Sequence, residues 1–257
     1  MRGRLALVGS GEYTPAMQDV EGWLLDGRPR RYVQLATAAA PEGERTLDYW
    51  WSLGADAAAR LDAEQVVVDV RVRADADNPA LAAQIAGAGL VYLSGGNPAY
   101  VNRTLQGTAV WRAILDAWRG GASLAGCSAG AVALGGLVTD YRRAINATVD
   151  GLAVVPTMRV IPHFDRLGKA IPDMALRLLL REGYTTVGID EDTALLAQDP
   201  REEADESADD ARGVEHDSAP DTSALWSFRS RGVGSAWRLD RDRRHRINAP
   251  LRLPVAT

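Results

Sequence analysis

Short apolar runs alternate with segments of helical periodicity along the first half of the chain. The apolar runs predict strands over residues 5–8, 32–36, 65–70, 90–93 and 122–125. The amphipathic segments between them predict helices over residues 15–25, 42–61, 79–86 and 108–119. The strands are mostly continuous apolar runs, as expected where both faces of a sheet are buried. This pattern predicts an α/β fold with a mainly parallel sheet and helices on both faces.

The second half of the chain is less regular. Its patterns predict strands over 159–162, 184–189 and 193–197 and a helix over 174–181. Residues 199–222 are rich in Asp and Glu and poor in large apolar side chains, which predicts a solvated acidic loop. The C-terminal part, about 224–252, is expected to form a hairpin from strands over 225–228 and 234–239.

Length, composition and charge narrow the class of protein. With 257 residues and 46% hydrophobic content, the chain is long enough for one large core, so residues 1–257 are interpreted as a single α/β domain. The net charge of −5 gives no reason to expect binding to nucleic acid. No apolar stretch approaches the roughly 20 residues that span a membrane, and none resembles a signal peptide. A cytoplasmic protein is therefore expected.

The chain has one cysteine, Cys127, so neither an intrachain disulfide nor a Cys-rich metal site is expected. This cysteine belongs to the segment Gly-Cys-Ser-Ala-Gly at 126–130, which reads G-x-S-x-G. An apolar run precedes the segment and small residues follow it, which is typical of a serine raised on a sharp turn between a strand and a helix. Ser128 is therefore the candidate nucleophile. The alternative is a Gly/Ala-rich turn that only packs closely.

A serine hydroxyl needs a base to take its proton, and histidine is the usual one. The chain has three histidines: His163 follows a predicted strand, while His216 and His245 lie in highly charged segments. His163 is therefore the candidate base; the alternative is a histidine that only hydrogen-bonds within the core. A carboxylate should orient the imidazole. The residues leave several candidates open for this role, namely Asp140, Asp165, Asp190, Glu191 and Asp192.

Glycines follow three of the predicted strands, and the carboxyl ends of parallel strands meet at one edge of a sheet. An oxyanion hole at this edge needs two backbone donors. The N–H group of Ala129, directly after the candidate nucleophile, is one of them. Gly95 and Gly96 are both candidates for the second, since their turn ends the neighbouring strand.

Four motifs in this order and spacing resemble peptidase family S51, which contains aspartyl dipeptidase (peptidase E) and cyanophycinase. They are Ser-Gly-Gly-Asn at 94–97, Gly-Cys-Ser-Ala-Gly-Ala at 126–131, Pro-His-Phe at 162–164 and Gly-Ile-Asp-Glu-Asp-Thr-Ala at 188–194. The resemblance spans roughly residues 3–198. It implies a single peptidase domain with a class I glutamine-amidotransferase-like (flavodoxin-like) fold and a Ser-His-acid mechanism without metal or cofactor.

The resemblance also implies roles for individual residues. Ser128 falls on the family's nucleophile, His163 on its base, and Gly96 and Ala129 on its oxyanion positions. The Gly-Ile-Asp-Glu stretch is more similar to cyanophycinase than to peptidase E, which favours Glu191 as the acid.

Substrates of the two subfamilies carry carboxylates, which a cationic side chain should hold. Arg166 and Lys169, just after the candidate base, are therefore candidate substrate-binding residues, and Asn97 of the Ser-Gly-Gly-Asn motif is a further candidate. The expected activity is that of a serine exopeptidase on short peptides, aspartyl dipeptidase-like in one reading. A broader carboxypeptidase, a cyanophycinase-like hydrolase, an esterase or amidase, and an inactive binding protein on the same fold are the alternatives. A homodimer is left open.

Overall fold

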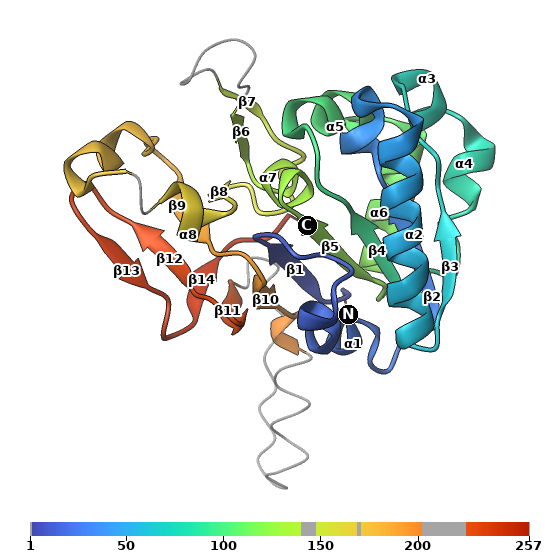
Figure 1. Ribbon diagram of the computed structural model, residues 1–257, viewed down its shortest axis with the longest axis horizontal. Helices are drawn as coiled ribbons and strands as arrows, with labels where there is room; N and C mark the ends of the chain where they lie inside the picture. The colour runs from blue at the N-terminus through green and yellow to red at the C-terminus, as the bar shows by residue number, and fades with distance from the viewer. Residues whose placement is uncertain (1, 140–147, 169–170, 202–224, 257) are drawn as a thin grey trace, which may run out of the picture.

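The computed structural model describes residues 2–139, 148–168, 171–201 and 225–256, which form helices and three β-sheets (Figure 1). The largest sheet has eight strands in the order β14-β11-β10-β1-β5-β4-β2-β3. Five of them are mutually parallel: β1 (Leu5–Val8), β5 (Ser123–Cys127), β4 (Leu90–Leu93), β2 (Arg31–Leu35) and β3 (Glu64–Val67). Three antiparallel strands complete one side: β10 (Thr193–Ala197), β11 (Trp226–Gly232) and β14 (Leu251–Leu253).

The side chains of each strand alternate between the two faces of the main sheet. Both faces therefore carry apolar side chains, and helices cover both. In β1, Leu5 and Leu7 join one hydrophobic cluster, whereas Ala6 and Val8 join another. The first cluster contains residues of α5 (Pro98–Leu105), α6 (Ala109–Arg119) and α7 (Ala129–Leu134). The second contains residues of α1 (Gln18–Leu25) and α2 (Glu44–Arg60). In Figure 1, α2 crosses in front of the main sheet and α6 lies behind it.

The second sheet has the order β13-β12-β9-β8 and lies to the left of the main sheet in Figure 1. Its strands are β8 (Met158–Ile161), β9 (Thr185–Ile189), β12 (Ala236–Leu239) and β13 (Arg244–Arg246). The third sheet pairs β6 (Leu137–Thr139) with β7 (Thr148–Asp150). Short helical segments join these elements: η1 (Pro15–Met17), η2 (Thr37–Glu42), α3 (Arg73–Ala76), α4 (Pro79–Ala83), α8 (Phe164–Leu167) and η3 (Asp173–Leu178).

The predicted α/β fold with a mainly parallel sheet is confirmed, and the predicted strands of the first half lie at or near their expected positions. Helix α5 was not predicted, and the helix expected over 174–181 is instead the 3-10 segment η3. Of the expected acidic loop, residues 202–222 lie outside the described residues.

The pairing predicted for the C-terminal hairpin is wrong. The strands expected over 225–228 and 234–239 correspond to β11 and β12, which belong to different sheets. β11 pairs with β10, and β12 pairs with β9 and forms its hairpin with β13 instead. The physical reason is that β9 and β10 already diverge at the turn 190–192, so the two later strands follow them into separate sheets.

A buried carboxylate fixes the loop that follows β1. Glu21 of α1 is 1% exposed, and its Oε1 accepts a hydrogen bond of 2.9 Å from the backbone N–H of Tyr13. Tyr13 has φ of 66°, and its hydroxyl is 2.7 Å from Oγ of Ser94 at the end of β4. Burial raises the pKa of Glu21 to about 7. The loop is thereby tied to both α1 and β4 through a group that titrates near neutral pH.

Replacing Glu21 should change how stability depends on pH. A carboxyl group whose pKa is raised on folding stabilises the protein while protonated, and this contribution is lost as pH rises from about 4.5 to about 7. The difference in unfolding free energy, Glu21→Gln minus wild type, should therefore rise by on the order of 2 kcal/mol from pH 5 to pH 8, because the wild type loses stability over this range. Urea unfolding across this range measures the difference. Asp19→Asn, at an exposed position of the same helix, is the control, and parallel curves for wild type and Glu21→Gln would refute the assignment.

Candidate active site

Ser128 occupies a tight turn between β5 and α7, with φ of 47° and ψ of −106°. Its N–H donates to the carbonyl of Val8, at the end of β1, over 2.9 Å. The flanking glycines make the turn possible. A Cβ on Gly126 would lie 2.6 Å from the carbonyl carbon of Gly130, and a Cβ on Gly130 would collide with the backbone of Leu93. The expected strand, turn and helix are thus present, with the serine at the carboxyl edge of the main sheet.

His163 lies directly across from this serine, with Nε2 3.0 Å from Oγ of Ser128. It follows β8 of the second sheet and begins α8 in the left-handed conformation, with φ of 49°. Its side chain is 35% exposed. The structure therefore brings the predicted nucleophile and the predicted base within hydrogen-bonding distance.

Glu191, in the turn after β9, lies on the other side of the imidazole ring. Its Oε1 is 2.8 Å from Nδ1 of His163, and its Oε2 is 2.9 Å from Nε of Arg166. The backbone N–H of Glu191 donates to the Oδ1 of Asp165 over 3.0 Å. Since β8 and β9 are parallel neighbours, their carboxyl ends place the histidine and the glutamate side by side.

Of the other acid candidates, Asp165 and Asp190 are engaged elsewhere, and within the described residues no hydrogen bond or ion pair joins Asp192 to His163. Asp190 is buried and accepts hydrogen bonds of 3.0 Å from the backbone N–H of Ser235 and from Nε1 of Trp237. Asp165 accepts the N–H of Glu191, and Asp140 lies outside the described residues. Among the candidates that the structure describes, Glu191 is the one whose carboxylate contacts His163.

The backbone donors near Ser128 differ in availability. Gly95 donates its N–H to Oε1 of Glu12 over 2.8 Å. The N–H groups of Gly96 and Ala129 have no hydrogen-bond acceptor within the described parts of the chain. Gly96 has φ of 134° and packs on the backbone of Ala38, where a Cβ would collide. The geometry therefore favours Gly96 over Gly95 as the partner of Ala129 in an oxyanion hole.

A pocket of about 360 Å³ opens beside these groups. Its described lining is Ser10, Gly11, Glu12, Thr14, Tyr49, Trp50, Leu53, Gly95, Gly96, Ser128 and His163. These residues come from the loop after β1, from α2, and from the turns after β4, β5 and β8. Within this set there is a carboxylate, but no lysine or arginine.

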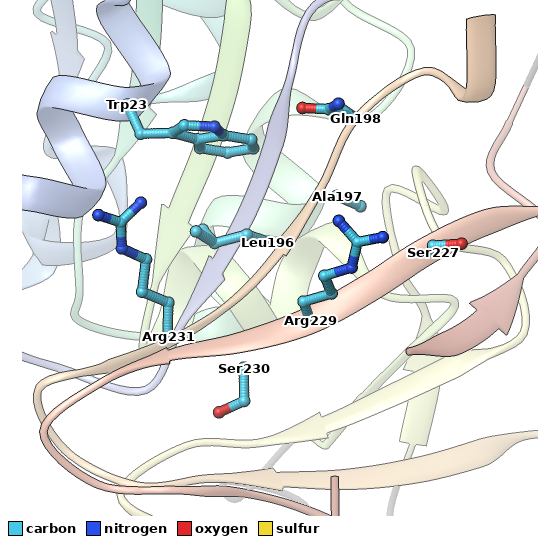
Figure 2. A pocket seen from close by; sticks show the side chains of 8 residues that line it. All are labelled: Trp23, Leu196, Ala197, Gln198, Ser227, Arg229, Ser230 and Arg231. Atoms are coloured by element: carbon cyan, nitrogen blue, oxygen red, sulfur yellow. The ribbon is translucent and has the colours of Figure 1, made fainter. Parts of the chain in front are cut away.

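Another pocket, of about 310 Å³, is shown in Figure 2. Trp23 of α1 faces strands β10 and β11, and the side chains of Arg229 and Arg231 extend from β11 on the side of Trp23. Its lining includes Ser227 and Ser230 but none of the described histidines, so no base is at hand for either hydroxyl. The pocket beside Ser128 is therefore the candidate active site.

The three predicted substrate-binding residues differ in their contacts and exposure. The Oδ1 of Asn97 accepts the N–H of Tyr100 over 2.9 Å and caps α5. Arg166 is bound to Glu191 and its side chain is 75% exposed, while Lys169 lies outside the described residues. Their roles in substrate binding remain predictions.

Sequence reasoning missed Glu12, Tyr49 and Trp50 as lining residues of the pocket. Only the glycines around Glu12 pointed to this edge of the sheet.

A model of peptidase family S51 matches residues 50–204. The chain belongs to this family. A peptidase from an acI-B1 actinobacterium has a similar structure, with a TM-score of 0.78 and 33% sequence identity, over 99% of this chain and 97% of that one. A peptidase E-type protein from Listeria monocytogenes EGD-e matches with a TM-score of 0.56 and 18% identity, over 76% of this chain and 94% of that one. None of the curated proteins compared with the chain matches it.

Membership of family S51 confirms the resemblance inferred from the four motifs. The fold is that of peptidase E-type, class I glutamine-amidotransferase-like proteins, and the family and its structural neighbours support a peptidase. In the described ranges, no helix has the length and apolar character needed to cross a membrane. Nor do those ranges contain a group of three or more His, Cys, Asp or Glu side chains arranged to hold a metal ion.

The contacts of Asp190 predict a structural effect of its substitution. Asp190→Asn replaces one of two acceptor oxygens with an N–H group that faces a donor, either Ser235 or Trp237. We expect a loss of about 1–3 kcal/mol in unfolding free energy, measured by urea unfolding. Asp192→Asn, in the adjacent turn, is the control and should change stability by less than about 0.5 kcal/mol. Unchanged stability together with abolished peptide hydrolysis in Asp190→Asn would instead point to Asp190 as the acid.

Proposed function

We propose that this member of family S51 is a serine exopeptidase that hydrolyses short peptides with Ser128, His163 and Glu191. The continuous hydrogen-bonded series from Oγ of Ser128 through the imidazole of His163 to the carboxylate of Glu191 carries this proposal. The order along the chain is Ser, His, acid, which differs from the Ser, acid, His order of common α/β-hydrolases. The order therefore favours a peptidase over an esterase of that kind.

In the proposed acylation step, Nε2 of His163 takes the proton of the Ser128 hydroxyl as Oγ attacks the carbonyl carbon of the peptide. Glu191 holds the proton on Nδ1 and stabilises the imidazolium that forms. The other oxygen of Glu191 is held by Arg166 over 2.9 Å, which restricts the rotation of the carboxylate.

The N–H groups of Gly96 and Ala129 donate hydrogen bonds to the carbonyl oxygen and stabilise the negative charge that develops on it. Collapse of the tetrahedral intermediate breaks the C–N bond, and His163 returns its proton to the leaving amine. A water molecule then attacks the acyl carbon while His163 takes one of its protons. Collapse of this second intermediate breaks the Oγ–C bond, and His163 gives the proton to Oγ, which releases the acid and restores the Ser128 hydroxyl.

The size and lining of the pocket support a short substrate. Its volume of about 360 Å³ lies near the lower end of small-molecule sites. An aspartyl dipeptidase or a carboxypeptidase would need a cation for the substrate carboxylate, and the described lining offers none. The substrate-binding roles of Arg166 and Lys169 stay predictions. A cytoplasmic location and a homodimer also stay predictions.

Removal of the nucleophile should abolish turnover. Ser128→Ala should lower kcat for a cleaved dipeptide by about 10⁴-fold or more, because the acyl-enzyme cannot form. The measurement is amino-acid release from a dipeptide panel, with thermal unfolding to establish that the fold is kept. Undiminished hydrolysis by a clean Ser128→Ala preparation would contradict the serine mechanism.

Changing the acid should affect kcat more than KM. In Glu191→Gln the side-chain amide can donate to Nδ1 and so favour the imidazole tautomer that cannot accept the serine proton at Nε2. We expect kcat to fall by about 10²- to 10⁴-fold. Glu182→Gln, the same substitution at an exposed glutamate, is the matched control and should change kcat by less than about twofold. Equal losses in the two variants would remove Glu191 from the proposed role.

A further inference from the structure

Glu12 is a buried carboxylate that lines the candidate active site and has no part in the proposed Ser-His-Glu mechanism. It lies in the loop after β1, is 4% exposed and shares the pocket with Ser128 and His163. Its Oε1 accepts the N–H of Gly95 over 2.8 Å, and its Oε2 accepts the S–H of Cys127 over 2.7 Å. Burial and the nearby Glu12 raise the pKa of the Cys127 thiol well above its usual value, so that the thiol remains a donor.

The charge of Glu12 has no cationic partner in the described ranges of the chain. Glu191, by contrast, contacts both His163 and Arg166. A buried carboxylate without a counter-charge is costly even when it accepts hydrogen bonds. An ionised carboxylate offers about four lone pairs, of which Gly95 and Cys127 engage two. Glu12 therefore has both the charge and the acceptor capacity to bind a cation that enters the pocket.

The position of Glu12 relative to the nucleophile limits which cation this is. A Cβ built on Gly95 would lie 2.9 Å from Oε1 of Glu12 and 3.6 Å from Cβ of Ser128. Oε1 of Glu12 and Cβ of Ser128 therefore lie within about 6.5 Å of each other, on either side of Gly95. In a peptide bound for attack, the amine on the adjacent α-carbon lies about 2.5 Å from the carbonyl carbon, which is within this reach, and a free amine is the cationic group there.

We propose that Glu12 binds the free α-ammonium group of the residue whose carbonyl carbon Ser128 attacks. This inference rests on the proposed serine exopeptidase function and specifies it as an amino-terminal one, acting on dipeptides or on the first bond of short peptides. Tyr49, Trp50 and Leu53 line the same pocket and suit an uncharged first side chain. An acidic first side chain would add negative charge beside Glu12.

The same charge acts on the reaction itself. The oxyanion and the Glu12 carboxylate are both negative and lie in one partly desolvated pocket, so each raises the energy of the other. A substrate ammonium placed against Glu12 removes this repulsion when the tetrahedral intermediate forms. A substrate without the amine would therefore lose transition-state stabilisation as well as binding.

The test compares three substrates that differ only at the amine: Leu-Leu, N-acetyl-Leu-Leu and the des-amino analogue 4-methylpentanoyl-Leu. For the wild-type enzyme, kcat/KM for Leu-Leu should exceed that for each of the others by about 30-fold or more. In Glu12→Gln, which retains a side-chain oxygen for the N–H of Gly95, the preference over the des-amino analogue should fall below about threefold. Hydrolysis of the des-amino analogue by this variant should persist, which a merely structural role of Glu12 does not predict.

Two controls make the result specific. Cys127→Ala removes the other donor to Glu12 but keeps the carboxylate, so the preference for the free amine should remain. Calorimetry with Ser128→Ala measures binding without turnover: Leu-Leu should bind at least about tenfold more tightly than its acetylated form, and the double variant Ser128→Ala/Glu12→Gln should lose this difference.

The outcomes separate this inference from the proposed function. Ser128-dependent hydrolysis of free and acetylated peptides at equal rates would overturn the role of Glu12 alone. So would an equal loss for all three substrates in Glu12→Gln, or a preference for Asp-Leu over Leu-Leu. If the wild type cleaves none of the peptides, the proposed function fails, and the calorimetric difference then decides whether Glu12 binds the ammonium.

Discussion

The close approach of α7 to the ends of β4 and β5 is the constraint on which the candidate site depends. Neither Gly126 nor Gly130 has room for a Cβ, so the chain can turn sharply enough to hold Ser128 at φ of 47°. A non-glycine residue in such a conformation costs on the order of 1–3 kcal/mol, which the surrounding packing must supply. Every residue of α7 is buried, and this packing holds the strained turn in place.

The second sheet brings the base and the acid to the nucleophile on the main sheet. Its parallel strands β8 and β9 end side by side, and His163 and Glu191 follow these ends. His163 also has a positive φ, so both members of the Ser-His pair are held in conformations that a free chain avoids. Their 3.0 Å contact is thus set by backbone geometry on two separate sheets.

Much of this arrangement follows from the sequence because its signals are local. Continuous apolar runs marked the buried strands, and G-x-S-x-G marked the turn. Pairing between distant strands carries no such signal, which is why β11 and β12 were wrongly expected to form one hairpin. Asp190 and Glu191 could not be told apart by spacing, since consecutive residues point to opposite sides; only the fold shows that Asp190 meets Ser235 and Trp237.

The charges of the site form two unequal sets. Glu191 has a cationic partner built into the protein, Arg166, and also hydrogen-bonds His163, so its carboxylate is fixed before any ligand arrives. Glu12 is more deeply buried and is held by a backbone N–H and a thiol, which position it without neutralising it. Since preorganised charge is strongest where water is excluded, the two carboxylates act differently on a ligand. The carboxylate of Glu191 orients and stabilises the imidazole of His163. The carboxylate of Glu12 leaves the pocket with a negative charge that a bound cation neutralises.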